Sequence, residues 1–318
     1  MTDVENFYQL VKFGKPEFIP SHIPDHHASY LGAYHEDLEG QGHECPVGTV
    51  WNDVWGVTFK KEFEGVMAFP IAYPLADLTK LGDFPFPDLN DPKYTSRIYD
   101  EAKKAGNFIL SGANNNLIWE KAYFLVGMEN LMEYFYTEPE LVKKLFHRIM
   151  DFQLELAEHN IKAGCRIIDM GDDLGIQNSL LLGMDLFNEF LLPEYERIFD
   201  FYKDKDVIIN FHSCGYIEPM IDTFIRLGVN ILNPVQASAN NLEKVRELTK
   251  GKLILSGAVN SDVIYGGTED EIRGLVRRRI DTLGKDGEYI CCPDQGLNYP
   301  PRNVEILEDE VVKYGRLA

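Results

Sequence analysis

Apolar and polar positions along the second half of the chain predict strands and helices in alternation. A helix is expected from about Glu138 to Ala163, because its apolar residues recur every 3.6 positions; a capping box of Thr137 and Glu140 begins it and Gly164 ends it. Short apolar runs follow, each separated from the next by a helical pattern. With one earlier run included, the predicted strands are 108–110, 166–170, 207–211, 229–232, 253–255 and 289–291.

Short apolar runs between helices are typical of parallel strands that are buried on both faces. Two further units would complete a (β/α)8 TIM barrel, and an open doubly wound sheet is the competing α/β fold. No glycine-rich nucleotide-binding pattern follows any of these strands, so the barrel is favoured. We predict a single domain over residues 1–318. Its barrel body covers about residues 101–318, and an N-terminal subregion of about residues 1–100, rich in aromatic residues, His and Pro, packs over the C-terminal mouth.

Polar clusters follow five of the predicted strands. In TIM barrels the active site lies at the C-terminal ends of the strands, so these clusters are expected to meet at one mouth. They occupy residues 169–173, 212–214, 233–236, 256–260 and 292–295.

The segment 210–215, Asn-Phe-His-Ser-Cys-Gly, carries the strongest chemical signal. Alternation along a strand sends Asn210, His212 and Cys214 to one face, while Ile209 and Phe211 face the helices. Imidazole and thiolate are zinc ligands, and catalytic zinc usually has three protein ligands and one open position. We therefore predict a zinc site at His212 and Cys214. The alternative is a hydrogen-bonded histidine beside a buried thiol.

The third ligand stays open at this point. Cys292 is preferred over Cys291 because it lies nearer the mouth, although both are also suited to the core. Asp172 and Asp173, close to Asp169, offer a further ligand or a general acid, since neighbouring like charges raise at least one pKa. The alternative for this segment is an Asp-rich turn that caps the next helix.

Composition narrows the range of partners and compartments. A formal net charge of -20 disfavours nucleic acid and membrane surfaces. We expect a cytoplasmic protein, because the chain has no targeting or membrane-spanning segment and its five cysteines are too few for a disulfide scaffold. The N-terminal histidines match no zinc-finger spacing and are interpreted as loop residues. They are His22, His26, His27, His35 and His43, with Cys45 nearby.

Several motifs together resemble the uroporphyrinogen decarboxylase superfamily, and specifically its corrinoid-dependent methyltransferase branch. The likeness runs from Glu5-Asn6-Phe7 to Pro301. It is carried by Trp51-Asn52-Asp53-Val54-Trp55-Gly56, by the GDDLGIQN segment 171–178, by His212-Ser213-Cys214-Gly215, by Asn233-Pro234-Val235-Gln236 and by Pro300-Pro301.

The resemblance implies a TIM barrel that uses zinc to transfer a methyl group, with a cobalamin-bearing corrinoid protein as partner and a monomeric or homodimeric state. Thiol-methylating members add a later Cys to the H-x-C pair, and Gln295 stands at that position here. This departure favours transfer from a methyl ether, such as a methoxylated aromatic, to Co(I) of the corrinoid protein. The alternatives are a methylcobalamin:thiol methyltransferase and a non-catalytic corrinoid-binding paralogue; decarboxylation is disfavoured because no arginine precedes Arg97.

The residues expected at this site fall into four groups. The small-molecule methyl donor is assigned to a pocket formed by aromatic residues of the N-terminal subregion. Trp51, Trp55, Phe69 and Tyr73 are candidates for this pocket, although core packing is the preferred interpretation for most of them. The metal ligands are His212, Cys214 and Cys292, the acids are Asp172 and Asp173, and the substrate-binding residues are Gln177, Asn233 and Gln295.

Overall fold

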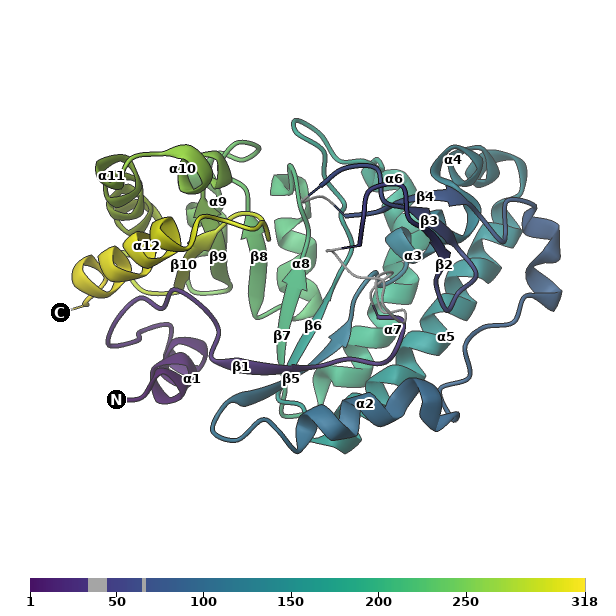
Figure 1. The fold of residues 1–318 in the computed structure, drawn as a ribbon, viewed down its shortest axis with the longest axis horizontal. Helices are drawn as coiled ribbons and strands as arrows, with labels where there is room; N and C mark the ends of the chain where they lie inside the picture. The colour runs from purple at the N-terminus through teal and green to yellow at the C-terminus, as the bar shows by residue number, and fades with distance from the viewer. Residues whose placement is uncertain (34–44, 65–66, 318) are drawn as a thin grey trace.

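A computed structural model of the chain describes residues 1–33, 45–64 and 67–317 (Figure 1). The strands are β1 (Asp25–Ala28), β2 (Val50–Asn52), β3 (Thr58–Lys60), β4 (Phe69–Ala72), β5 (Ile109–Asn114), β6 (Ile167–Gly171), β7 (Ile208–His212), β8 (Ile231–Val235), β9 (Ile254–Val259) and β10 (Tyr289–Pro293). The helices are α1 (Asp3–Phe13), α2 (Pro92–Ala102), α3 (Trp119–Val126), α4 (Met128–Thr137), α5 (Pro139–Ala163), α6 (Met184–Leu186), α7 (Leu192–Lys203), α8 (Ile221–Leu227), α9 (Leu242–Thr249), α10 (Ser261–Gly266), α11 (Glu269–Arg279) and α12 (Pro301–Tyr314). Shorter helical turns occupy Leu78–Asp83, Phe187–Leu191, Glu218–Met220 and Ile280–Gly284.

Seven parallel strands form one curled sheet in the order β1-β5-β6-β7-β8-β9-β10, with helices packed outside it (Figure 1). This arrangement confirms the predicted TIM-barrel-like α/β fold. All six strands predicted from apolar runs are present, and five of them, β5, β6, β7, β8 and β9, begin one or two residues later and extend beyond the predicted end. They extend because the backbones of the polar residues at the mouth still pair with the neighbouring strands.

The two edge strands of this sheet, β1 and β10, are not paired with each other in the described part of the chain. The segment that leads into β1 lies between them instead, and the N–H of Cys291 donates to Pro20 O at 2.9 Å. Pro16, Pro20 and Pro24 lack the N–H that a ladder requires, so this segment cannot pair as a regular eighth strand.

A layer of isoleucines fills the N-terminal end of the barrel. Helix α1 covers this layer with Phe7 and Leu10, both buried. The start of the N-terminal subregion thus closes the end opposite the mouth, because the apolar stripe of α1 matches the isoleucine layer. One isoleucine comes from each of six strands: Ile109, Ile167, Ile208, Ile231, Ile254 and Ile290.

Residues 50–72 of the N-terminal subregion, as far as the structure describes them, pack on helices beside the barrel. The small antiparallel sheet β2-β3-β4 contacts α3 through Phe59, whose ring lies 5.7 Å from that of Phe124. Trp55 packs against Phe152 of α5 at 4.6 Å. Trp51 and Trp55 are therefore core residues, whereas Phe69 is exposed.

The start of helix α5 differs from the prediction. Thr137 is the last residue of α4, and its hydroxyl donates to Glu133 O at 3.1 Å. A helical Thr137 cannot cap the following helix, so the predicted capping box with Glu140 is wrong: Glu138 is the N-cap and makes no side-chain cap bond. The predicted end at Gly164, which is left-handed with φ 91°, is confirmed.

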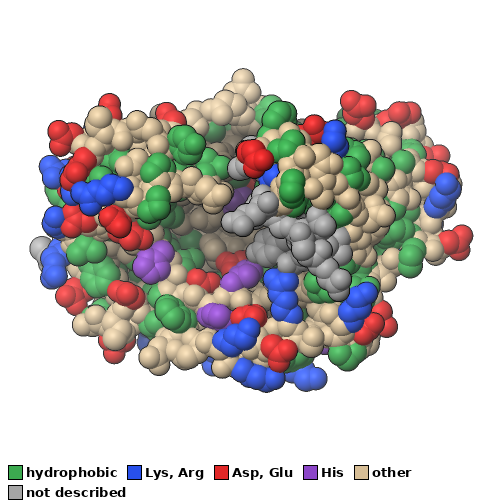
Figure 2. All heavy atoms as spheres, viewed as in Figure 1, with side chains coloured by type: hydrophobic (Ala, Val, Ile, Leu, Met, Phe, Trp, Pro, Cys, Tyr) green, Lys and Arg blue, Asp and Glu red, His purple; other side chains and the backbone are tan. Residues whose placement is uncertain are grey.

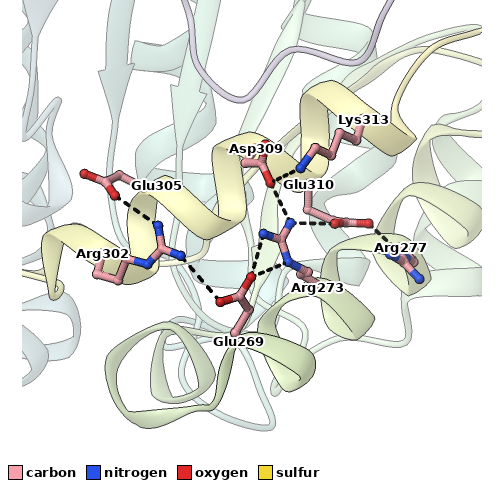
Figure 3. Close-up of polar contacts among 8 residues, drawn as sticks. All are labelled: Glu269, Arg273, Arg277, Arg302, Glu305, Asp309, Glu310 and Lys313. Atoms are coloured by element: carbon pink, nitrogen blue, oxygen red, sulfur yellow. Dashed lines mark hydrogen bonds and ion pairs between the residues drawn. The ribbon is translucent and has the colours of Figure 1, made fainter.

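Charged side chains tie α12 to α11 on the outside of the barrel (Figure 3). Glu310 is buried and accepts from Arg273 at 2.8 Å and from Arg277 at 2.5 Å. Arg273 also bonds Asp309 and Glu269. Within the described residues, no helix is both long and apolar enough to cross a lipid bilayer.

Candidate metal site at the barrel mouth

Above the isoleucine layer, the next inward-facing residues of the strands are polar and form a belt around the barrel. One chain of contacts links Asp25, Ser111, His27, Asp169 and Asn210. A second chain links His212 to Asn233, Asn233 to Ser256, and Ser256 to Cys292. Figure 2 shows a hollow on this molecule with histidine and acidic side chains in and around it. The prediction that the strand ends meet at one mouth is confirmed by these contacts.

Three potential metal ligands meet at the mouth: Asp173, His212 and Cys214. Their ligand atoms all lie within 4.8 Å of one another. His212 Nε2 is 3.3 Å from Asp173 Oδ1 and 3.4 Å from Cys214 Sγ. The side chains of His212 and Asp173 are 50% and 41% exposed, so a ligand in the mouth can reach them.

Two glycines let the loops that carry these residues approach each other. Gly171 ends β6, and a Cβ there would lie 2.0 Å from His212 O. Gly215 has φ +82°, and a Cβ there would lie 2.4 Å from the backbone of Gly175. Any larger residue at either position would push the loop after β6 away from the loop after β7, and would separate Asp173 from His212.

Neighbouring polar side chains orient the three ligands. His212 Nδ1 lies 3.1 Å from Asn233 Oδ1, which fixes the proton on Nδ1 and leaves Nε2 facing Asp173 and Cys214. Asp173 Oδ1 accepts from the N–H of Cys214 at 2.9 Å, and Gln295 Nε2 lies 3.6 Å from Cys214 Sγ. Two of the predicted substrate-binding residues, Asn233 and Gln295, thus contact candidate ligands.

The electrostatics of the site favour a cation. Burial opposes protonation of His212, yet its hydrogen bonds to Asp173 and Cys214 raise its pKa well above the usual range. Burial would raise the pKa of Asp173, but the hydrogen bond from His212 lowers it. A proton on His212 therefore balances the negative charge of its neighbours, which is the role that a metal ion would also fill.

Glu120, on α3, is a site residue that the sequence analysis missed. Burial, followed by the charges of Asp173 and Asp172, raises the pKa of Glu120 to about 8, so its carboxyl group is protonated at neutral pH. The hydroxyl of Tyr123 donates to Glu120 Oε1 at 3.3 Å. The polar run that starts at Asn114, the last residue of β5, and continues to Asn116 marks the same mouth, but it does not single out Glu120.

Asp172 has a structural role in this arrangement. Its carboxylate is fully buried and accepts from the N–H groups of Ile118, at 3.0 Å, and Glu120, at 2.9 Å. The hydroxyl of Tyr195 donates to it at 2.6 Å. Asp172 therefore caps α3, a helix from an earlier unit of the barrel, rather than the next helix along the chain.

The remaining predicted residues lie elsewhere. Cys292 faces the barrel interior, as predicted, but its Sγ lies 3.3 Å from Ser256 Oγ and it is not among the three grouped ligands of the described residues. Cys291 is buried in the core, and burial raises its pKa to about 12. Gln177 donates to Ser238 O at 2.6 Å and joins two loops of the mouth.

The N-terminal histidines divide into two kinds. His26 and His22 bond Glu101 and Ser21, whereas His27 points into the polar belt. His35 and His43 lie outside the described residues.

Two of the three ligand separations match those around a zinc ion. Tetrahedral zinc at its usual bond lengths holds nitrogen and oxygen ligands about 3.3 Å apart, and nitrogen and sulfur ligands about 3.5 Å apart. The corresponding separations are 3.3 Å and 3.4 Å. Imidazole, thiolate and carboxylate are all zinc ligands, and three of them leave a fourth position for a substrate.

Comparisons with known proteins agree with this fold. The model of the uroporphyrinogen decarboxylase (URO-D) family matches residues 113–314. A uroporphyrinogen decarboxylase from Francisella philomiragia is 25% identical over 240 residues, which are 71% of this chain and 66% of that protein. The methylcobamide:CoM methyltransferase of Methanosarcina mazei is 21% identical over 151 residues, 46% of this chain and 42% of that protein. The chain thus spans less than two thirds of either relative.

A solved structure resembles the whole chain. A methyltransferase from Methanosarcina mazei superimposes with a TM-score of 0.73 and 16% identity, covering 99% of both chains. At this identity the likeness describes the fold.

Proposed function

The chain belongs to the uroporphyrinogen decarboxylase family, and from this premise we propose that it is a zinc-dependent methyltransferase that moves a methyl group from a methyl ether to the Co(I) of a corrinoid protein. The observation that carries the proposal is the group of Asp173, His212 and Cys214, near which burial and the charges of Asp173 and Asp172 raise the pKa of Glu120. Asp173 takes the place of Cys292 as the third ligand.

Ether cleavage is difficult because an alkoxide or phenoxide is a poor leaving group. A zinc ion held by Asp173, His212 and Cys214 would supply a Lewis acid that polarises the ether oxygen. Glu120 donates its proton to that oxygen as the C–O bond breaks and both bonding electrons stay on oxygen. The Co(I) corrinoid of the partner protein would be the acceptor of the methyl group. Glu120 thus fills the acid role that the sequence analysis gave to Asp172 and Asp173.

Methyl transfer from a panel of methoxylated aromatics to reduced corrinoid protein tests this function. We expect turnover of at least one ether, and a fall of about 100-fold or more with Glu120→Gln, because removal of a general acid costs that much. Glu129→Gln, on an exposed position of α4, is the matched control and should leave the rate unchanged. No turnover of any ether by the unaltered protein would reject the proposal.

The second candidate is a methylcobalamin:thiol methyltransferase, which the name of the Methanosarcina mazei relative favours. The same assay separates the two functions when methylcobalamin and a thiol replace the ether and the reduced corrinoid protein. Activity with the thiol and none with any ether would make this the function of the chain.

A further inference from the structure

A second group of potential metal ligands lies in the polar belt, apart from the first. Asp25 and His27 of β1 and Asp169 of β6 have ligand atoms that all lie within 4.8 Å of one another. His27 Nδ1 is 3.4 Å from Asp169 Oδ2. Adjacent nitrogen and oxygen ligands of an octahedral ion with bonds of about 2.2 Å lie about 3.1 Å apart, so a small rotation of either side chain would give these two atoms the spacing that such an ion needs.

Partners on β5 and β7 hold these ligands in place. Ser111 Oγ donates to Asp25 Oδ2 at 2.5 Å and lies 3.2 Å from His27 Nδ1. Asn210 Nδ2 donates to Asp169 Oδ1 at 2.7 Å, which leaves Asp169 Oδ2 turned toward His27. Metal-binding carboxylates are commonly held in this way, with one oxygen bonded to a neighbour and the other directed at the ion.

An ion can reach this position from the mouth. Two carboxylates face one imidazole, and the positive charge of Arg97, which also acts on His27, offsets part of their negative charge. The side chains of His27 and Asp169 are 34% and 22% exposed, which leaves a route from the mouth.

The register of the sheet separates the two groups. Asp169 pairs with Asn210, whereas His212 lies two residues further along β7, which is about 7 Å at the rise of a strand. Ions that act as a pair lie about 3.5–4 Å apart, so this position would hold a separate ion.

We propose that Asp25, His27 and Asp169 form a second divalent-metal site, which takes a first-row transition-metal ion that prefers oxygen ligands, such as Mn²⁺. Carboxylate oxygens suit Mn²⁺, whereas the thiolate of Cys214 favours zinc at the first site. This inference is independent of the proposed methyltransferase activity.

Mn²⁺ titration followed by electron paramagnetic resonance tests the site. The protein is first loaded with one equivalent of zinc. We expect it to bind one Mn²⁺ per chain. His27→Ala and Asp169→Asn should each lower the affinity for Mn²⁺ by about 100-fold or more, because loss of a residue that only hydrogen-bonds a metal ligand already lowers metal affinity by about 10–100-fold. His26→Ala is the matched control: His26 is adjacent in sequence but bonds Glu101, so Mn²⁺ binding should not change.

Two further measurements keep the proposal falsifiable if a variant folds poorly. In the unaltered protein, pulsed resonance of bound Mn²⁺ should detect coupling to one imidazole nitrogen. The double variant His212→Ala/Cys214→Ala should lose zinc at the first site and keep Mn²⁺ binding, so that failure of the proposed function and failure of this site are distinguishable. No Mn²⁺ uptake by the unaltered protein, no nitrogen coupling, or equal affinity in a folded His27→Ala variant would overturn the proposal.

Discussion

Asp173 and His212 come from the loops of neighbouring strands, and Asp173 Oδ1 lies 3.3 Å from His212 Nε2. Asn233 fixes the opposite nitrogen of the same ring, so the only ring nitrogen available to a metal is the one that faces Asp173 and Cys214. The three side chains and Glu120 place a candidate metal site next to a protonated acid, and this relationship underlies the predictions below.

The third ligand can be identified by zinc affinity. Asp173→Ala removes a ligand and should lower the affinity for zinc by more than about 100-fold. Loss of a residue that only hydrogen-bonds a metal ligand already lowers metal affinity by about 10–100-fold. Cys292→Ser should change the affinity little, because Cys292 contacts Ser256 and lies outside the grouped ligands. Competition with a chromophoric chelator measures both. A large loss in Cys292→Ser with no loss in Asp173→Ala would restore the ligand set predicted from sequence.

Asp172 is expected to stabilise the fold rather than bind metal. Asp172→Ala leaves the N–H groups of Ile118 and Glu120 and the hydroxyl of Tyr195 without their acceptor. The free energy of unfolding should fall by about 3 kcal/mol, the usual cost of unsatisfied buried groups. Tyr195→Phe removes one of these bonds and should cost about 1 kcal/mol. Urea unfolding measures both, and a cost below that of Tyr195→Phe would contradict the capping role.

Glu120 makes the stability of the metal-free protein depend on pH. Burial, followed by the charges of Asp173 and Asp172, raises its pKa from 4.5 to about 8. The folded state binds this proton more tightly than the unfolded chain does, so the stabilisation is full below pH 4.5 and is lost as the pH rises toward 8. Urea unfolding measures the free energy of unfolding across this pH window. Its decline with rising pH should be smaller in Glu120→Gln, whose side chain cannot ionise, and should be unchanged in Glu129→Gln. Equal declines in the unaltered protein and Glu120→Gln would rule out this titration.

The ion pairs between α11 and α12 predict a second, opposite dependence on pH. Burial opposes ionisation of Glu310, but hydrogen bonds from Arg277 and Arg273 lower its pKa (Figure 3). Its contribution is therefore present above pH 4.5 and lost as the pH falls below that value.

Substitution of Glu310 measures the size of this contribution. Glu310→Ala at neutral pH should lower the free energy of unfolding by about 1 kcal/mol, because it removes the ion pairs to Arg273, which keeps two other carboxylate partners, and to Arg277, which is half exposed. Glu305→Ala, an exposed position on the same helix, should change it by less than about 0.5 kcal/mol. Similar losses in both variants would show that Glu310 is not specially stabilising.

Periodicity was sufficient to predict the barrel, and alternation was sufficient to predict the inward face of β7. Ile209 and Phe211 lie in the outer core while His212 faces the mouth, because a strand of period two allows no other arrangement. The third ligand and the acid depend on loops. Asp172 and Asp173 are adjacent in sequence, and only the packing of α3 against the loop after β6 buries one and turns the other toward His212.

Glu120 was beyond sequence reasoning for a related reason. Its raised pKa depends on burial beside Asp172 and Asp173, which come from another unit of the barrel. His27 could not be distinguished from His26 for a similar reason, because the two side chains are identical. Only the orientation of β1 in the sheet turns His27 into the polar belt and His26 toward Glu101.

X-ray absorption at the zinc edge tests the central claim most directly. The protein is loaded with one equivalent of zinc, and the scattering reports which atoms surround the ion. We predict one sulfur neighbour at about 2.3 Å and nitrogen or oxygen neighbours at about 2.0–2.2 Å, as expected for Cys214 with His212 and Asp173. Two sulfur neighbours would contradict the account by returning Cys292 to the site, and none would contradict it by removing zinc from Cys214.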